Sequence, residues 1–297
     1  MKDERNSTFF SIVICTLNRK NFLRVCLKSI LESNFPKSQY EIIVVDGGSN
    51  DGTDLFCKQV PEVRFIVERR FGLAHARNRG ADLAKGDIVA YTDDDCIVDK
   101  YWLSSLFLGF QKFPQAAGVG GPVYPIHPEI IPKKILVKAA LGLLDQGENI
   151  KPAEGIITSN AAFRKEVFQK IRFDDLIGAS RRGKLILCGE DTDFFNSLDE
   201  FKLEIFYLPS AKVYHQVQQH RIRVSYIIKH AMHNGITRTK MNLKKCSRVW
   251  AIRYSVGQLV QYGLRVPFDT SFTSCYNLVY GISTLFVSVT GLDKLFF

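Results

Sequence analysis

Residues 87–95 read DIVAYTDDD, a short apolar run that ends in three adjacent carboxylates. Three similar β-branched runs precede it, at residues 9–15, 41–45 and 63–67, and helical patterns separate them. Behind the first run, for example, apolar residues recur at the helical period at positions 22, 23, 26, 27, 30 and 31. Strands that alternate with helices are typical of a parallel sheet with helices on its faces. The sequence therefore predicts an α/β fold with a Rossmann-like, mostly parallel sheet.

The second half of the chain is less regular. Strand-like runs occur at residues 118–124, 156–163 and 203–213, and residues 190–198 have a helical pattern. From Arg221 onward the sequence changes to basic helical stretches, which Pro267 interrupts. We expect a catalytic-type domain over residues 1–220 and a C-terminal helical appendage over residues 221–297.

Composition excludes several classes of protein. The chain has 297 residues, of which 46% are hydrophobic and 24% charged, so it has enough apolar mass for a core and is not a disordered chain. Its seven cysteines have no C-x-x-C pair, which favours a reducing compartment over a disulfide scaffold or a zinc finger. The first residues lack the pattern of a signal peptide, and no continuous apolar 20-residue run predicts a membrane span.

The net charge of +10 resides in the last third of the chain, where residues 201–297 hold 13 Lys and Arg against Glu204, Asp269 and Asp293. Basic stretches interleaved with Trp250, Tyr254 and apolar neighbours are typical of helices that lie on an anionic membrane surface. Residues 270–292 are uncharged, but nine are Ser, Thr or Asn, which is too polar for a span. We expect a protein of the cytoplasm, peripheral on the inner face of the cell membrane. The alternative is that these helices pack on the catalytic domain or on a dimer partner.

Carboxylates follow two of the predicted strands. Asp46 ends the run VVD, and Asp93, Asp94 and Asp95 end the run quoted first. Ligands of open parallel sheets bind at the carboxyl ends of the strands. Adjacent carboxylates repel one another unless a cation compensates them, so Asp-x-Asp at a strand end indicates a clamp for Mg²⁺ or Mn²⁺ and a diphosphate. The alternative is a solvated acidic turn.

Two further segments carry polar groups that could serve chemistry. Residues 46–53 read DGGSNDGT, a glycine-rich turn that could approach a nucleotide or simply connect a strand to a helix. Residues 189–194 read GEDTDF, in which Glu190 and Asp191 open a helical pattern. Acidic residues at a helix start are favoured by the helix dipole, and a carboxylate held there could also act as a general base.

Taken in order, SIVICTLNR at residues 11–19, VVDGGSNDGT at 44–53, GLAHARNRG at 72–80, the DDD strand end and GEDTDF resemble family 2 glycosyltransferases of the GT-A fold. The resemblance covers about residues 9–215. It implies an enzyme of the hexosyltransferase type (EC 2.4), a nucleotide-diphosphate-sugar donor with UDP favoured, a divalent metal (Mg²⁺ or Mn²⁺) and an inverting displacement. The acceptor would be a hydroxyl of a glycan or a lipid-linked glycan in the synthesis of surface polysaccharide or glycolipid.

The resemblance also assigns roles to individual residues, namely Asp191 as the catalytic base; Thr16, Asn18, Asp46, Arg77, Asp93 and Asp94 on the nucleotide and donor; Asn160 and Glu190 on the acceptor side; and Asp95, Asp93 and His215 on the metal. For Arg77 the alternative is an ordinary helix-surface arginine. For His215 it is a core or surface imidazole.

Three other functions are weighed against this one. A nucleotidyltransferase would carry a glycine-rich basic loop after its first strand, where this chain reads TLNRK. A nucleic-acid-binding function would explain the basic tail, but the carboxylates at the strand ends would repel the phosphates of the nucleic acid. A catalytically inactive relative acting as a membrane scaffold would not need intact Asp46, Asp95 and Asp191.

Overall fold

The computed structural model describes residues 8–131, 138–153, 155–175, 177, 189–245, 247–263 and 272–290. The chain divides into two compact units. The first comprises residues up to Ile126 together with Leu143–Phe173 and Phe194–Gln216. The second comprises His127–Gly142, Asp174–Asp193 and the residues from Val217 onward, so it takes two internal segments as well as the expected C-terminal one.

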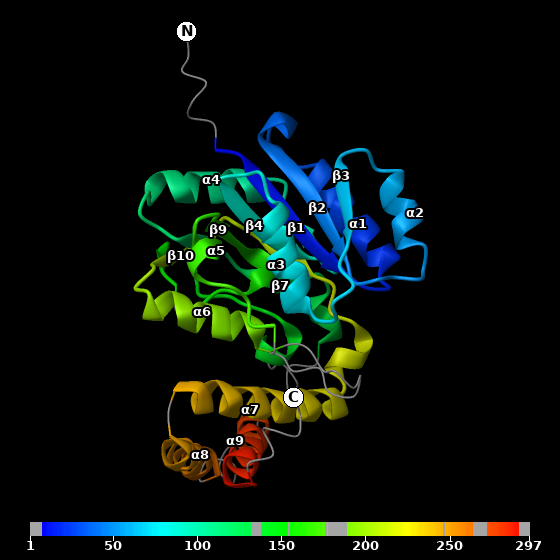
Figure 1. The fold of residues 1–297 in the computed structure, drawn as a ribbon. Helices are drawn as coiled ribbons and strands as arrows, with labels where there is room; N and C mark the ends of the chain where they lie inside the picture. Colours follow the sequence, from blue (N-terminus) through cyan, green and yellow to red (C-terminus); the bar gives the residue numbers. More distant parts are fainter. Residues whose placement is uncertain are drawn as a thin grey trace. The chain divides into compact units, whose positions relative to one another are not determined.

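The first unit is built on an eight-stranded sheet in the order β3-β2-β1-β4-β9-β6-β10-β8 (Figure 1). Its first half is parallel and contains β1 (Phe10–Thr16), β2 (Tyr40–Asp46), β3 (Val63–Val67) and β4 (Ile88–Asp93). The remaining strands are β6 (Gly118–Gly120), β8 (Lys151–Pro152), β9 (Ala161–Arg164) and β10 (Ile205–Tyr207). Strand β9 runs antiparallel to both β4 and β6. The predicted mostly parallel α/β sheet is therefore confirmed.

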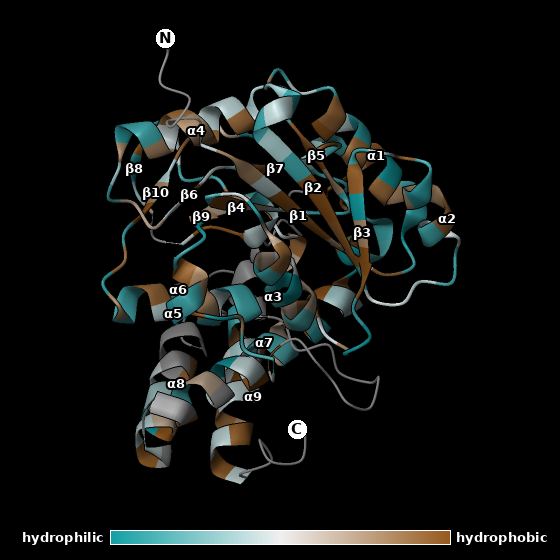
Figure 2. Ribbon diagram, turned by 45° about the horizontal axis from the view of Figure 1, so that its top comes forward, coloured by the Kyte–Doolittle hydropathy of each residue, from teal (hydrophilic) through white to brown (hydrophobic). Residues whose placement is uncertain are grey.

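Helices cover both faces of this sheet, because its central strands are apolar on both sides (Figure 2). One face packs Ile12 and Ile14 of β1 against Leu23 of α1 (Lys20–Leu31) and Trp102 of α4 (Trp102–Lys112). The other face packs Val13 among residues of α3 (Leu73–Leu83), α5 (Val167–Lys170) and α6 (Glu190–Glu200). Helix α2 (Thr53–Lys58) connects β2 to β3.

None of the three strand-like runs predicted in the second half is one continuous strand. Of residues 156–163, only those from Ala161 onward belong to a strand, β9, which follows a 3-10 turn at Thr158–Asn160. Residues 118–124 divide into β6 and β7 (Val123–Pro125), and residues 203–213 divide into β10 and β11 (Val213–His215). Strands β7 and β11 join β5 (Cys96–Val98) in a separate three-stranded sheet of order β5-β11-β7. The breaks occur at Pro122 and Pro209, because proline cannot donate a hydrogen bond within a sheet.

In the described residues after Gln216, the α-helices are α7 (Val224–Lys245), α8 (Arg248–Gly263) and α9 (Phe272–Thr290). Helices α7 and α9 cross closely, since a Cβ added at Gly235 would lie 2.6 Å from the carbonyl oxygen of Tyr280. Thr239 donates a hydrogen bond across this crossing to the carbonyl oxygen of Thr284. Within the described residues, no helix is long and apolar enough to cross a membrane.

Candidate active site

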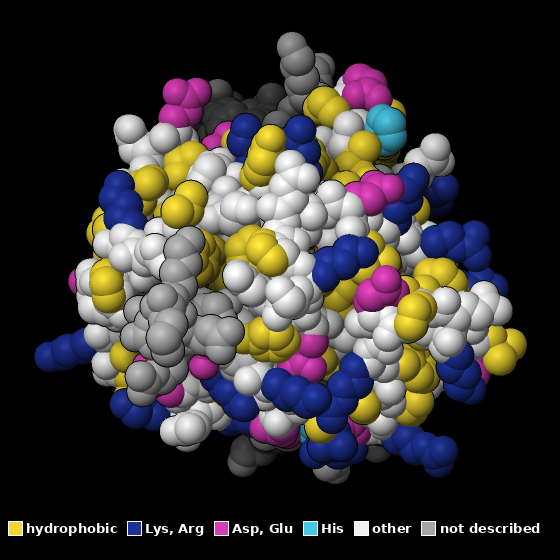
Figure 3. Space-filling view, turned by 90° about the horizontal axis from the view of Figure 1, so that it is seen from above, with side chains coloured by type: hydrophobic (Ala, Val, Ile, Leu, Met, Phe, Trp, Pro, Cys, Tyr) yellow, Lys and Arg dark blue, Asp and Glu magenta, His cyan; other side chains and the backbone are white. Residues whose placement is uncertain are grey.

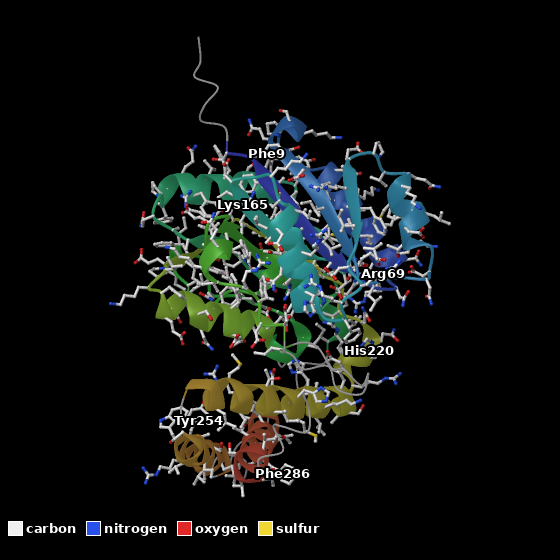
Figure 4. The ribbon with its side chains drawn as sticks, viewed as in Figure 1. Phe9, Arg69, Lys165, His220, Tyr254 and Phe286 are labelled. Atoms are coloured by element: carbon white, nitrogen blue, oxygen red, sulfur yellow. The ribbon has the colours of Figure 1, made fainter. Side chains whose placement is uncertain are left out.

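The candidate site lies at the carboxyl ends of the parallel strands. In Figure 4, Phe9 marks the amino end of β1 and Arg69 lies beyond the carboxyl end of β3, so the two labels mark opposite ends of the parallel strands. The register pairs Thr16 with Asp46 and Cys15 with Asp93, so the ends of β1, β2 and β4 are level. The topology thus brings to one edge three segments that lie far apart in the sequence.

Asp94 is held from two sides by the end of β1 and the residues after it. Its Oδ2 accepts a hydrogen bond from Thr16 Oγ1 at 2.8 Å, and its Oδ1 lies 3.0 Å from Arg19 Nη1. Burial raises the pKa of Asp94 to about 6, in spite of the opposing effect of the Arg19 charge. Asp94 and Thr16, both predicted on the donor, here form a buried pair beneath the strand ends.

The Asp95 carboxylate contacts both the Arg19 guanidinium and the His215 imidazole. Its Oδ2 lies 2.9 Å from Arg19 Nη1 and 3.3 Å from His215 Nε2. Strand β11 pairs with β5 in a register that places His215 opposite Cys96, and Gln216 N–H donates to the carbonyl oxygen of Asp95. The structure therefore brings His215 into the carboxylate cluster, although 120 residues separate it from Asp95 in the sequence.

Arg77 approaches the cluster from α3. Its Nη2 lies 3.4 Å from Asp93 Oδ1, and its guanidinium packs over the ring of Phe173. Tyr91 Oη donates to the Arg77 carbonyl oxygen at 3.1 Å. Only 3% of the side chain is exposed, so the alternative of a helix-surface arginine is wrong. Arg77 can neutralise Asp93, the most exposed of the three carboxylates, or a phosphate that displaces it.

The Asp46 loop is organised by its own side chains. Asp46 Oδ2 accepts hydrogen bonds from the N–H groups of Gly48 and Ser49, and Ser49 Oγ donates to Asp46 Oδ1. Asn18, with a left-handed φ of 54°, binds the same loop from β1, since its Oδ1 accepts from Asn50 N–H at 2.8 Å. Asp46 and Asn18 thus bind the same loop, and their predicted role of holding the nucleotide base stays a prediction.

Asn160 departs from the prediction. Its side chain is fully buried and its amide group is fully used: Oδ1 accepts from Trp102 Nε1 at 2.8 Å, and Nδ2 donates to the carbonyl oxygens of Pro122 and Ala211. An amide whose donors and acceptor are satisfied in the core has nothing left to offer an acceptor sugar. Asn160 instead links α4 to the β6–β7 connection through its hydrogen bonds.

Glu190 and Asp191 open helix α6 after Gly189, which has a φ of +113°. Glu190 is buried and accepts a hydrogen bond from Gly189 N–H at 3.2 Å, whereas Asp191 is half-buried. Both residues belong to the second unit and are described within it. Their predicted roles, acceptor contact and base, stay predictions.

The chemistry of the donor set fits a divalent metal. Asp95 and His215 offer a carboxylate oxygen and an imidazole nitrogen side by side, and Asp93 adds an exposed carboxylate nearby. In the part of the chain that the structure describes, no group of three or more His, Cys, Asp or Glu side chains could hold a metal on its own. Mg²⁺ and Mn²⁺ can be held by one or two carboxylates, with water and diphosphate oxygens completing the shell.

Arg19 is the member of this cluster that the sequence reasoning missed. It contacts two of the three carboxylates, yet the motif SIVICTLNR, which it ends, predicts no role for it. The available signal was charge complementarity, because a basic residue directly after β1 lies beside the end of β4 when the two strands are parallel neighbours.

Comparison with known proteins agrees with this geometry. The family model described as Glycosyl transferase family 2 matches residues 11–172. The chain is 22% identical over 243 residues, 78% of its length and 77% of the relative, to a glucosyl-dolichyl phosphate glucuronosyltransferase of Haloferax volcanii. It is 28% identical over 246 residues, 79% of its length and 75% of the relative, to the succinoglycan biosynthesis protein ExoM of Rhizobium meliloti.

Among solved structures, the chain resembles a mannosyltransferase from Pyrobaculum calidifontis in complex with GDP-Man and Mn²⁺. The TM-score is 0.63 at 16% identity, and the match covers 97% of this chain and 89% of that one. A structure of S. aureus TarS residues 1–349 matches with a TM-score of 0.56 at 13% identity, covering 97% and 83%. At these identities the likeness establishes the fold, which is of the GT-A type.

Proposed function

The chain belongs to glycosyl transferase family 2, and from this membership we propose that it is an inverting enzyme that moves a sugar from a nucleotide-diphosphate donor, UDP-sugar by preference, to a hydroxyl of a glycan or lipid-linked acceptor. That the protein is a glycosyltransferase follows from the family itself. The observation that supports the finer proposal is the convergence of Asp93 and Asp95 with Arg77 and His215 at one edge of the sheet. Relatives named for dolichyl phosphate and succinoglycan support the acceptor class.

In the proposed reaction each residue handles a defined group. The Asp191 carboxylate takes the proton of the acceptor hydroxyl, whose oxygen then forms a bond to the anomeric carbon while the bond to the diphosphate breaks on the opposite side. Asp46 and Asn18 hold the base, and Arg77 balances charge that develops on the departing diphosphate. A divalent metal, when bound at Asp93 and Asp95, would supply further neutralisation of that diphosphate.

Replacing Asp191 by Asn tests the proposed reaction. The rate of sugar transfer should fall by about 10²–10⁴-fold, because general base catalysis contributes that much. Binding of the nucleotide diphosphate in the presence of Mn²⁺ should be retained, since the amide removes only the proton acceptor. Transfer at the wild-type rate would disprove the role of Asp191, and a wild-type chain that shows no transfer with any donor would favour the inactive scaffold.

The donor class can be found with a thermal-shift panel of nucleotide diphosphates and their sugars, with and without Mn²⁺. Ligands that bind the folded chain raise its melting temperature by mass action. We expect one nucleotide, uridine by preference, to stabilise the chain more strongly when metal is present. Equal stabilisation by all nucleotides, or none by any, would contradict the proposed reading of the base by Asp46.

We also propose that α8 and α9 dock on an anionic membrane face. On α9 the small and polar residues Gly281, Thr284 and Ser288 are buried, whereas Ile282, Phe286 and Val289 are more than half exposed. A helix that buries its polar side and exposes its apolar side is packed as helices in lipid are, with small residues at the contact. On α8, Trp250 and Tyr254 stack at the surface near Arg253 (Figure 4 labels Tyr254 and Phe286).

A further inference from the structure

Arg19 is built into the carboxylate cluster as a resident cation. A single nitrogen, Nη1, contacts Asp94 Oδ1 at 3.0 Å and Asp95 Oδ2 at 2.9 Å. The two carboxylate side chains are 5% and 2% exposed, whereas the arginine side chain is 31% exposed. The guanidinium therefore reaches the buried acids from the solvent side, where it packs over the ring of Phe22.

Asp94 and Asp95 would keep different contacts if Arg19 moved away from them. Asp94 keeps its hydrogen bond from Thr16 Oγ1. Asp95 Oδ2 keeps the contact with His215 Nε2 but loses its contact with the guanidinium. The oxygen that Arg19 occupies is therefore the one that stands beside an imidazole nitrogen, and this combination of donors suits Mn²⁺.

A guanidinium and a divalent cation cannot both occupy that oxygen at close range, because like charges a few ångströms apart repel strongly in a site shielded from water. We propose that Arg19 competes with the divalent metal for Asp95 and thereby sets the metal affinity of the enzyme. Without metal, Arg19 neutralises the carboxylates; when metal binds, Arg19 releases Asp95. The inference rests on the proposed metal-dependent function, because it assigns Arg19 a role toward that metal.

Direct metal binding tests the inference. The full-length chain and its Arg19→Met variant are titrated with Mn²⁺ in the absence of nucleotide, and free Mn²⁺ is measured by electron paramagnetic resonance. Methionine keeps an unbranched, flexible side chain and removes its charge, so we expect Mn²⁺ to bind the variant roughly tenfold or more tightly. The matched control is Arg24→Met, since Arg24 lies on α1 over the ring of Phe56 and away from the acids. It should leave Mn²⁺ affinity unchanged.

A second variant keeps the test decisive if Arg19→Met fails to fold. Arg19→Lys retains a positive charge that can approach one carboxylate but lacks the forked guanidinium, so its Mn²⁺ affinity should rise by a smaller factor. Folding is followed by circular dichroism and thermal melting. Without metal Arg19→Met should melt below the wild type, and added Mn²⁺ should raise its melting temperature more than it raises that of the wild type.

The outcomes separate this inference from the proposed function. If the wild type binds Mn²⁺ with UDP but a folded Arg19 variant binds it equally or more weakly, Arg19 positions Asp95 and the competition is disproved while the function stands. If neither the wild type nor the variants bind Mn²⁺, with or without UDP, both the inference and the metal in the proposed reaction fail. Tighter binding by both Arg19 variants and not by Arg24→Met supports the competition.

Discussion

Asp94 is a buried carboxyl group, and its pKa makes the stability of the protein depend on pH. Burial raises this pKa to about 6, above the ordinary value near 3.8 that the unfolded chain has. The folded state therefore holds a proton that the unfolded state has released, so Asp94 contributes stability that is full below pH 3.8 and is lost as the pH rises through about 6.

We predict that Asp94→Asn removes this loss. The free energy of unfolding is measured with urea in buffer that contains chelator. The value for the variant minus the value for the wild type should rise by up to about 3 kcal/mol between pH 4 and pH 7. Any difference between the two proteins that does not depend on pH shifts the whole curve and leaves the slope as the observable. Parallel curves for the two proteins would show that Asp94 does not titrate in this range.

Asn160 gives a second prediction at the residue scale. Asn160→Ala leaves the Trp102 N–H and the carbonyl oxygens of Pro122 and Ala211 without their partner, so we expect a loss of about 3 kcal/mol or more in the free energy of unfolding. Asn34→Ala, at an exposed position, should cost less than about 0.5 kcal/mol. A variant that keeps its stability and raises only the KM for the acceptor would restore the acceptor role.

The sequence was enough to predict the position of some site residues but not the environment of others, and the reasons are physical. Asp46 and Asp93 could be placed at one edge because parallel strands end at the same level, and that rule needs only local patterns. Asn160 could not be assigned correctly, because its three partners lie 58, 38 and 51 residues away and depend on the packing of α4 and β10. Burial of Arg77 likewise depends on Phe173, which comes from a distant segment.

At the scale of elements, the packing of α3 on β1 depends on Gly80. A Cβ added at this position would collide with the side chain of Val13, so the helix and strand approach too closely for any other residue. We predict that Gly80→Ala lowers the free energy of unfolding by about 1–3 kcal/mol through overpacking. Gly257→Ala on α8 is the matched control, because nothing lies within 4 Å of its added Cβ.

The control variant should gain up to about 1 kcal/mol, since alanine favours a helix over glycine. Both free energies are measured by urea unfolding with circular dichroism. Equal effects of the two substitutions would show that helix propensity, and not the contact with Val13, governs Gly80.

The sequence also predicted the strands of the parallel half better than those of the second half. The strands of the parallel half are continuous apolar runs flanked by helices, so their pattern sufficed to locate β1, β2, β3 and β4. Residues 118–124 look like one strand although Pro122 interrupts it, and Gly121 beside this proline passes too close to the carbonyl oxygen of Ala211 for any side chain. That approach depends on a segment ninety residues later, which no local pattern contains.

At the scale of the whole molecule, charge and apolar surface predict association with membranes. Lys and Arg side chains are interspersed with acidic and hydrophobic ones on the face in Figure 3, whereas the excess of basic residues is concentrated in residues 201–297. Sedimentation with vesicles of phosphatidylcholine and phosphatidylglycerol should bring the chain down at low ionic strength, and high salt should release part of it.

The double variant Ile282→Ser, Phe286→Ser should weaken vesicle binding by about a hundredfold or more, because each lost apolar side chain removes about 1.5–3 kcal/mol of burial in lipid. Leu55→Ser, Leu108→Ser is the control, since both leucines are 62% exposed but belong to the first unit. A wild-type chain that stays in the supernatant at low ionic strength would disprove the docking.

The antiparallel pairing of β4 with β9 has a consequence for how the protein is made. A nascent chain that has left the ribosome as far as Asp93 already contains every strand of the parallel half, but Ala161, which pairs with Tyr91, has yet to be synthesised. At 5–20 residues per second the wait is on the order of ten seconds. During translation the unsatisfied amides of β4 are thus open to chaperones, or to another nascent copy, until the ribosome delivers β9.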